Sequence, residues 1–274
     1  MSDSPPFPAQ VVSRDPPVVM FTAPNPGPKT LEGTHTFVVG HDRTYVIDPG
    51  PDIPAYGDAL AAQLRDHGHV LQGILLTHGH PDHAPGAARL AETCGVPVWG
   101  STHLSSVAID RTYDDDQWFE VDGDHLRVLS TPGHASDHVA FWLESARILF
   151  SGDTILGYGS TLVAPPEGDM AAYMRSLEVM RRLQPRLIAP GHGPIIRDPE
   201  AKIAEYVEHR RLREQRLLAA LRQGPATARE LVERVYTDTD PRLMDLALGS
   251  VQAQLVKLVA EGAVRQAGEV FSLQ

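Results

Sequence analysis

The stretch Leu76-Thr77-His78-Gly79-His80-Pro81-Asp82-His83 decides what kind of protein this sequence encodes. Three histidines and one aspartate fall within six residues, directly after the apolar run 74–76. In an extended segment His78 and His80, two positions apart, point to the same side. Imidazole and carboxylate groups are zinc ligands, and a catalytic zinc keeps one coordination position open for water. A polar turn with chance histidines is the alternative, but so dense a grouping with an aspartate favours a metal site.

Further ligands are needed, and the chain offers three. His134, Asp153 and His192 occur in Pro132-Gly133-His134, Ser151-Gly152-Asp153 and Pro190-Gly191-His192. Each follows a short apolar run that is typical of a strand, beside a glycine that relaxes the backbone. Singly, each histidine would be an ordinary turn residue. Repetition after several strands predicts that these side chains meet at one rim of a sheet structure.

These motifs resemble the metallo-β-lactamase superfamily in its glyoxalase-II-like branch, whose signature is Thr-His-x-His-x-Asp-His. The resemblance implies two zinc ions and a full set of ligands: His78, His80 and His134 for the first ion, Asp82, His83 and His192 for the second, and Asp153 as the bridge. It also implies that Asp48 stands behind the ligands and orients one of them. Antibiotic-hydrolysing members commonly carry cysteine at the Asp153 position, which argues against a β-lactam substrate.

The resemblance also implies a mechanism. Two zinc ions hold a shared water and lower its pKa toward ~7, so that a metal-bound hydroxide is the nucleophile. Asp82 is the predicted catalytic residue, because it can orient that hydroxide and accept its proton. Such a centre can attack phosphorus or a carbonyl carbon, so the ligands alone do not choose the substrate.

Length and composition set the broad class. The chain has 274 residues, enough to bury a full core, and a single cysteine, Cys94, which excludes an internal disulfide. We expect a cytoplasmic protein without a membrane partner, because the first residues lack a secretory signal and no apolar run spans a bilayer. The net charge is −11, with −12 in residues 1–200 and +1 in residues 201–274. Binding to nucleic acid by bulk electrostatics is therefore not expected.

The order of elements predicts an α/β fold. Strands are expected at 36–39, 44–47, 70–76 and 96–99, with helices at 58–67 and 84–94. The second half repeats this pattern, with strands near 126–130, 138–143, 147–151 and 186–189 and a helix at about 169–183. Two similar halves predict an αββα sandwich, the metallo-β-lactamase fold. We assign residues 1–20 to a disordered, proline-rich N-terminus, 21–200 to the hydrolase domain and 201–274 to a helical linker and a small winged-helix domain.

The C-terminal domain is predicted from three helices and a hairpin. The helices cover 201–221, 227–235 with the capping box Thr227-Ala228-Arg229-Glu230, and 241–261, and the hairpin follows at 264–271. Sequence-specific DNA recognition is not expected, because no basic recognition helix is present. Packing against the main domain or against a second subunit, as in a homodimer, is the alternative role.

Nearly the whole chain after about residue 20 resembles the β-lactamase-like protein 2 family, which joins this hydrolase domain to a winged helix. The resemblance implies an endoribonuclease acting on single-stranded RNA. Hydrolysis of acyl thioesters, including intermediates on carrier proteins, is the alternative activity, and a non-catalytic winged-helix binding protein is a third hypothesis that the ligand set opposes. The predicted substrate contacts are Ser160, Thr161, His209 and Arg210.

Overall fold

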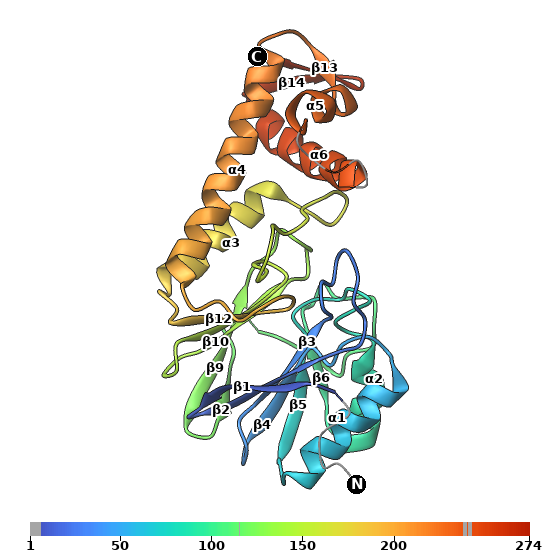
Figure 1. Ribbon diagram of the computed structural model, residues 1–274, viewed down its shortest axis with the longest axis vertical. Coiled ribbons are helices and arrows are strands. Elements are labelled where there is room, and N and C mark those ends of the chain that lie inside the picture. Colours follow the sequence, from blue (N-terminus) through green and yellow to red (C-terminus); the bar gives the residue numbers. More distant parts are fainter. Residues whose placement is uncertain (1–6, 115, 238–239, 241–242) are drawn as a thin grey trace. The chain divides into compact units, whose positions relative to one another are not determined.

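The computed structural model describes residues 7–114, 116–237, 240 and 243–274, which fall into two compact units (Figure 1). The first unit contains the described residues up to Ser130 together with Asp137–Gly159 and Gln184–Pro199. The second contains Thr131–Ser136, Ser160–Leu183 and Glu200–Gln274. It therefore includes two segments that precede the predicted boundary at residue 201.

The first unit contains two sheets. The seven-stranded sheet has the order β1-β2-β3-β4-β5-β6-β7, antiparallel from β1 to β4 and parallel from β4 to β7. Its strands are β1 (Ala9–Arg14), β2 (Pro17–Thr22), β3 (His35–Val39), β4 (Thr44–Ile47), β5 (Leu71–Leu75), β6 (Val98–Gly100) and β7 (Arg111–Thr112). The five-stranded sheet has the order β12-β11-β10-β9-β8, with only the β11–β12 pair parallel. Its strands are β8 (Trp118–Val121), β9 (Asp124–Ser130), β10 (Val139–Leu143), β11 (Ile148–Gly152) and β12 (Leu187–Pro190).

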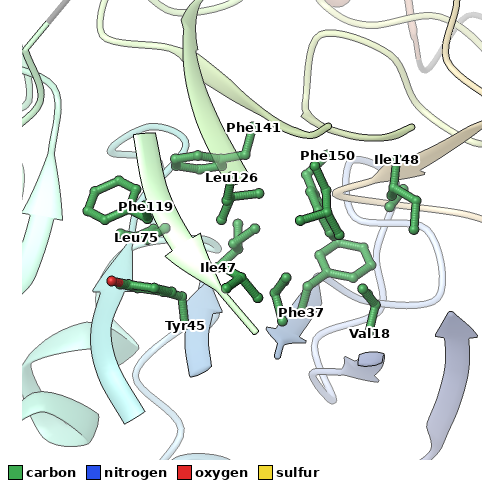
Figure 2. Packing of buried hydrophobic residues seen from close by; sticks show 14 of the residues in the cluster. Val18, Phe37, Tyr45, Ile47, Leu75, Phe119, Leu126, Phe141, Ile148 and Phe150 are labelled. Carbon is green, nitrogen blue, oxygen red and sulfur yellow. The ribbon is translucent and has the colours of Figure 1, made fainter. Parts of the chain in front are cut away.

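The two sheets face each other across an apolar core (Figure 2). Phe37 of the first sheet meets Phe150 of the second edge to face, with ring centroids 5.1 Å apart. Leu126 and Phe141 of the second sheet are fully buried in the same cluster. Burial of each such side chain contributes roughly 1.5–3 kcal/mol to stability. This core therefore fixes the two sheets against each other and so positions the loops that follow their strands.

Helices α1 (Pro54–Asp66) and α2 (Gly86–Cys94) pack on the other face of the seven-stranded sheet (Figure 1). Leu60, Leu64 and Leu90 share a second apolar cluster with Ile74 of β5. The parallel strands are therefore buried on both sides, as strands in βαβ units are. These helices and the main strands agree with the elements predicted from sequence.

The N-terminal segment corrects one prediction. Residues 9–14 and 17–22 form β1 and β2 rather than a disordered tail, while residues 1–6 lie outside the described part of the chain. Val18 and Met20 are buried in the inter-sheet core, which outweighs the high proline content. Pro16 and Pro17 lie at the turn and at the first position of β2, where a missing N–H does not break the ladder.

The second unit contains α3 (Met170–Arg182), α4 (Pro199–Leu221), β13 (Ala226–Thr227), α5 (Ala228–Val235), α6 (Met244–Ala260), β14 (Val264–Ala267) and β15 (Val270–Leu273). The predicted capping box is present, with Thr227 and Glu230 bonding to each other's backbone N–H. The end of α4, helices α5 and α6 and the sheet β13-β15-β14 share one apolar cluster, which gives the winged-helix arrangement. Positions 241 and 242 of the predicted third helix lie outside the described residues, and α6 begins at Met244. None of the helices described is both long enough and apolar enough to cross a membrane.

Candidate metal centre

The candidate ligands of the first unit lie just past strand ends in both of its sheets. Asp48 follows β4 and the loop His78–His83 follows β5, whereas Asp153 follows β11 and His192 follows β12. The motifs that end in His83, Asp153 and His192 are therefore brought to one place.

Two glycines make the close approach of these loops feasible. A Cβ on Gly191 would lie 2.6 Å from Asp153 Oδ1 and 2.8 Å from His83 Cε1, so any larger residue before His192 would collide with the site. Gly152, before Asp153, has φ +47°, in the left-handed region, and its Cβ would lie 2.6 Å from His138 Nε2. The glycine in each motif is thus required by the packing around the ligand that follows it.

Asp82, Asp153 and His192 each place a side-chain atom close to His83 Nε2. His83 Nε2 lies 3.4 Å from Asp82 Oδ2, 3.3 Å from Asp153 Oδ1 and 3.3 Å from His192 Nε2. His192 Nε2 lies 3.2 Å from Asp82 Oδ2 and 3.3 Å from Asp153 Oδ1. A tetrahedral zinc with bonds of about 2.05 Å holds its ligand atoms roughly 3.3–3.4 Å apart. The donor types and their spacing therefore fit a zinc ion bound by Asp82, His83 and His192 with Asp153 at its side.

The far side of each imidazole in this group is fixed by a hydrogen bond. His83 Nδ1 lies 2.8 Å from Asp48 Oδ2, and His192 Nδ1 lies 3.1 Å from the carbonyl oxygen of Gly33. Both acceptors hold the proton on Nδ1, which directs the lone pair of Nε2 toward the other ligands. Asp48 also accepts bonds from Thr77 N, at 2.8 Å, and from Thr77 Oγ1, at 2.6 Å. Buried beneath the loop, Asp48 thus occupies the supporting position that the resemblance implied.

A second group shares Asp153 with the first. His78, His80 and Asp153 each offer a ligand atom, and these atoms lie within 4.8 Å of one another. His78 Nδ1 lies 2.9 Å from Thr77 Oγ1, so the same threonine supports this histidine from behind. Asp48, His78 and His83 are equally close, but the Asp48 carboxylate is already occupied by Thr77 and His83. We therefore regard Asp48 as a support for ligands and not as a ligand.

His134 belongs to the second unit, in the loop Thr131–Ser136. Its Nδ1 lies 2.8 Å from the carbonyl oxygen of Leu162 in the same unit. That contact is of the kind that fixes the tautomer of a ligating histidine. The assignment of His134 to the first zinc remains a prediction from the family resemblance.

The charges in the group are arranged to attract a cation. Burial opposes ionisation of Asp82, but the hydrogen bond from His192 and the charge of His83 outweigh it and lower its pKa to about 2. Burial likewise opposes protonation of His192, yet the Asp153 carboxylate outweighs it and raises the pKa of the imidazole to about 9. A proton here occupies the place of a metal ion, so metal binding must displace it and will weaken as the pH falls.

Two residues that support Asp82 were not identified from sequence. Thr34 Oγ1 donates to Asp82 Oδ2 at 3.1 Å, and Asn25 Nδ2 donates to Thr34 Oγ1 at 2.9 Å. Asn25 Oδ1 also accepts from the backbone N–H of Thr34 at 2.9 Å. The two residues precede the ligand loop by about 50 positions, and no local spacing signals the contact. The sequence offered one weak signal, an asparagine and a threonine on either side of a Pro-Gly loop.

His138, interpreted from sequence as structural, lies behind Asp153. Its Nε2 accepts the backbone N–H of Asp153 at 3.1 Å, and its Nδ1 lies 3.3 Å from Thr154 Oγ1. Through these two contacts the His138 ring fixes the backbone at Asp153, whose carboxylate is the predicted bridge.

The predicted substrate contacts are only partly accessible. Ser160 is exposed and His209 is partly buried, but Thr161 and Arg210 are 2% and 5% exposed. Arg210 donates to the Thr161 carbonyl and stacks on Tyr173, with its guanidinium carbon 5.1 Å from the ring centroid. These contacts lie inside the second unit and correct the prediction that Thr161 and Arg210 touch a substrate.

Comparison with known proteins is consistent with this geometry. Residues 30–192 match the Metallo-beta-lactamase superfamily, and residues 227–272 match the Beta-lactamase associated winged helix domain. A "Beta-lactamase-like protein 2 homolog" from Caenorhabditis elegans is 34% identical over 249 residues, covering 88% of this chain and 83% of the relative. An "Atrochrysone carboxyl ACP thioesterase" from Aspergillus chevalieri is 34% identical over 277 residues, covering 95% of this chain and 86% of the relative.

A solved structure extends the similarity to both units. The metallo-beta-lactamase family protein from Thermus thermophilus has a TM-score of 0.78 at 25% identity, covering 94% of this chain and 98% of that one. The expected αββα fold with a C-terminal winged helix is therefore confirmed. The chain belongs to the metallo-β-lactamase superfamily and combines its hydrolase domain with the β-lactamase-associated winged helix.

Proposed function

We propose that the protein is a hydrolase with two zinc ions per chain that cleaves phosphodiester bonds in single-stranded RNA. The observation that carries the proposal is the set of five contacts of 3.2–3.4 Å that His83 Nε2 and His192 Nε2 make with each other and with Asp82 and Asp153. Asp48 and the Gly33 carbonyl support the two histidines from behind. Asp153 belongs to this set and also to the group with His78 and His80, which supports a bridge between two ions. His134 would complete the first ion's ligands.

When bound, the ions supply Lewis acidity that lowers the pKa of water toward ~7 and neutralises charge on the leaving group. Asp82 is the residue placed to handle the proton, because its side chain is 25% exposed while those of His83 and His192 are 0% and 1% exposed. A carboxylate at the solvent side can orient an incoming water and accept its proton. Thr34 holds one oxygen of that carboxylate, which restricts its rotation.

The resemblance to the β-lactamase-like protein 2 family supports RNA as the substrate. So do the exposed arginines Arg211 and Arg216 of α4, which could neutralise phosphates despite the acidic total charge. Phosphate contacts of this kind supply most of the affinity in sequence-independent binding.

Hydrolysis of an acyl thioester is the second candidate. It is favoured by the thioesterase relative that aligns with 95% of this chain, and by the net charge of −12 in residues 1–200. A thiolate leaves without a proton, so the absence of a further acid among the ligands would not slow the reaction.

The deciding experiment measures metal content and turnover together. Protein purified free of nucleases is assayed with labelled single-stranded RNA and, separately, with acyl thioesters, beside the variants His80→Ala and His125→Ala. His125 is an exposed histidine of β9 and serves as the control. RNA cleavage that disappears in His80→Ala, but not in His125→Ala, supports the first candidate. Thioester turnover without RNA cleavage replaces it with the second, and metal content far below two ions per chain contradicts both.

A further inference from the structure

The second unit contains a pocket that the metal chemistry does not use. It lies between the C-terminal part of α4 and the end of α5 and has a volume of about 510 Å³. Arg216 and two alanines line it from α4, and Gln223 lines it from the residues just after that helix. Arg234 of α5 and Thr237, which follows α5, line the other side. Its size is within the range of pockets that hold small ligands or parts of larger ones.

The polar lining of this pocket is cationic. Among the described residues that line it, none is an aspartate or a glutamate. Within the same described part of the chain, neither Arg216 nor Arg234 has an ion-pair partner. Glu230, four residues before Arg234, is engaged by Thr227 in the capping box at 2.7 and 2.9 Å. Both guanidinium groups are exposed and can accept an anion without breaking an existing contact.

A third arginine contacts a residue of the pocket lining, Val235. Arg213, one turn before Arg216, lies over the Tyr236 ring at 4.2 Å and donates to the Val235 carbonyl at 3.3 Å. It therefore holds the end of α5 against α4 and adds positive charge beside the pocket. The adjacent His209 reflects this, since burial and then the charges of Arg210 and Arg213 lower its pKa.

The guanidinium groups of Arg216 and Arg234 come from two separate elements, and guanidinium groups are well suited to bind phosphate. Each presents a planar fork of N–H donors that bonds two phosphate oxygens, and such charge-assisted bonds are stronger than neutral ones. Gln223 and Thr237 add an amide and a hydroxyl donor at the same pocket. An open, cationic pocket with hydrogen-bond donors on two sides suits a phosphate within a longer polymer, because the polymer can enter and leave the pocket at its open side.

We propose that the pocket between α4 and α5 binds a backbone phosphate of single-stranded RNA, with Arg216 and Arg234 as its principal donors. The inference rests on the proposed RNA substrate, but it concerns binding and not cleavage. It gives the winged-helix unit the task of holding the substrate chain.

The test compares two double variants in the full chain. Arg216→Ala/Arg234→Ala removes both pocket donors. Arg222→Ala/Arg229→Ala removes the same number of exposed arginines, one just after α4 and one from α5, without touching the pocket lining. Both are placed in the His80→Ala background to prevent cleavage, and thermal unfolding verifies that each is folded. Fluorescence anisotropy with a short labelled single-stranded RNA then gives Kd over a series of salt concentrations.

The pocket variant is expected to raise Kd about tenfold or more, since two charge-assisted contacts are lost. It should also lower the slope of log Kd against log salt by roughly 0.7 for each phosphate contact removed. The control variant should change Kd far less. Equal weakening by both variants, no effect of the pocket variant, or no measurable RNA binding by the parent protein would overturn the inference. Inorganic phosphate that binds the parent through these arginines, while RNA does not, would overturn it in favour of a small phosphate ligand.

These outcomes separate the inference from the proposed function. RNA bound through the pocket but not cleaved by the wild-type chain leaves the inference intact and removes the proposed activity. RNA cleaved by a chain whose affinity does not depend on Arg216 and Arg234 does the reverse.

Discussion

Replacement of Asp48 by asparagine should weaken metal binding although Asp48 is not a ligand. Its carboxylate accepts three bonds, from Thr77 N at 2.8 Å, Thr77 Oγ1 at 2.6 Å and His83 Nδ1 at 2.8 Å. An asparagine has one acceptor oxygen, which can keep the Thr77 backbone bond. Its NH₂ group would then face His83 Nδ1, and two donors cannot share that contact.

His83 can relieve this conflict by moving its proton from Nδ1 to Nε2. His83 Nε2 is the atom that faces the other candidate ligands. It lies 3.3 Å from His192 Nε2 and from Asp153 Oδ1, and 3.4 Å from Asp82 Oδ2. A protonated Nε2 cannot bind a metal. Loss of such a support typically lowers metal affinity about 10–100-fold, or roughly 1.4–2.7 kcal/mol. Loss of charge-assisted bonds at this buried position should also cost about 1.5–3 kcal/mol of unfolding free energy.

Competition with a chromophoric chelator measures the zinc affinity, and urea denaturation measures the stability. Asp124→Asn is the matched control, because Asp124 is also buried and accepts backbone bonds from His125 at 2.7 Å and Ser145 at 2.9 Å, away from the metal centre. The control should lose stability and keep its zinc affinity. If Asp48→Asn binds zinc as tightly as the wild type, Asp48 does not set the tautomer of His83 and the reasoning is wrong.

Three further predictions concern the surroundings of the site. Thr34→Val removes the donor to Asp82 and should lower kcat about tenfold, whereas Thr34→Ser keeps the hydroxyl and should stay near wild type in the same steady-state assay. Gly133→Ala should lose more than about 2 kcal/mol in urea unfolding, because φ is +138° and the new Cβ would lie 2.3 Å from Tyr173 Cα; an unchanged midpoint would contradict this packing. Burial lowers the pKa of His35 from its ordinary 6.5 to about 4. Between pH 4 and 6.5 His35 is therefore protonated in the unfolded chain but neutral in the folded one. Stability should therefore fall by up to about 3 kcal/mol as the pH drops from about 6.5 to 4, and His35→Gln should flatten this part of the pH–stability curve.

The candidate ligands could be located from sequence because they occur in short local motifs. A strand, a glycine and then a histidine or aspartate specify both the end of an element and the chemistry placed there, as at Asp153 and His192. The supports could not be predicted in the same way. Thr34 reaches Asp82 across 48 positions, and only the assembled sheets bring the two together.

The errors also have physical causes. Proline content suggested disorder near the N-terminus, but the buried face of β2 outweighs it through Val18 and Met20. The arginines of α4 suggested a surface that binds substrate. Arg210, however, shares the buried side of the helix with Ile203, Tyr206 and Leu217, at intervals of three, four and seven residues. That helical periodicity was visible in the sequence and would have placed Arg210 inside.

The candidate metal ligands of the first unit follow strands of different sheets, His78–His83 in the seven-stranded one and Asp153 and His192 in the five-stranded one. A bound ion would therefore cross-link the two sheets of the sandwich, in addition to the apolar contacts between them. A ligand that binds only the folded chain adds about 4.1 kcal/mol at a thousandfold excess over its Kd. The abundance of this protein in a cell would then follow the supply of zinc, since chains without metal would open and be degraded more often.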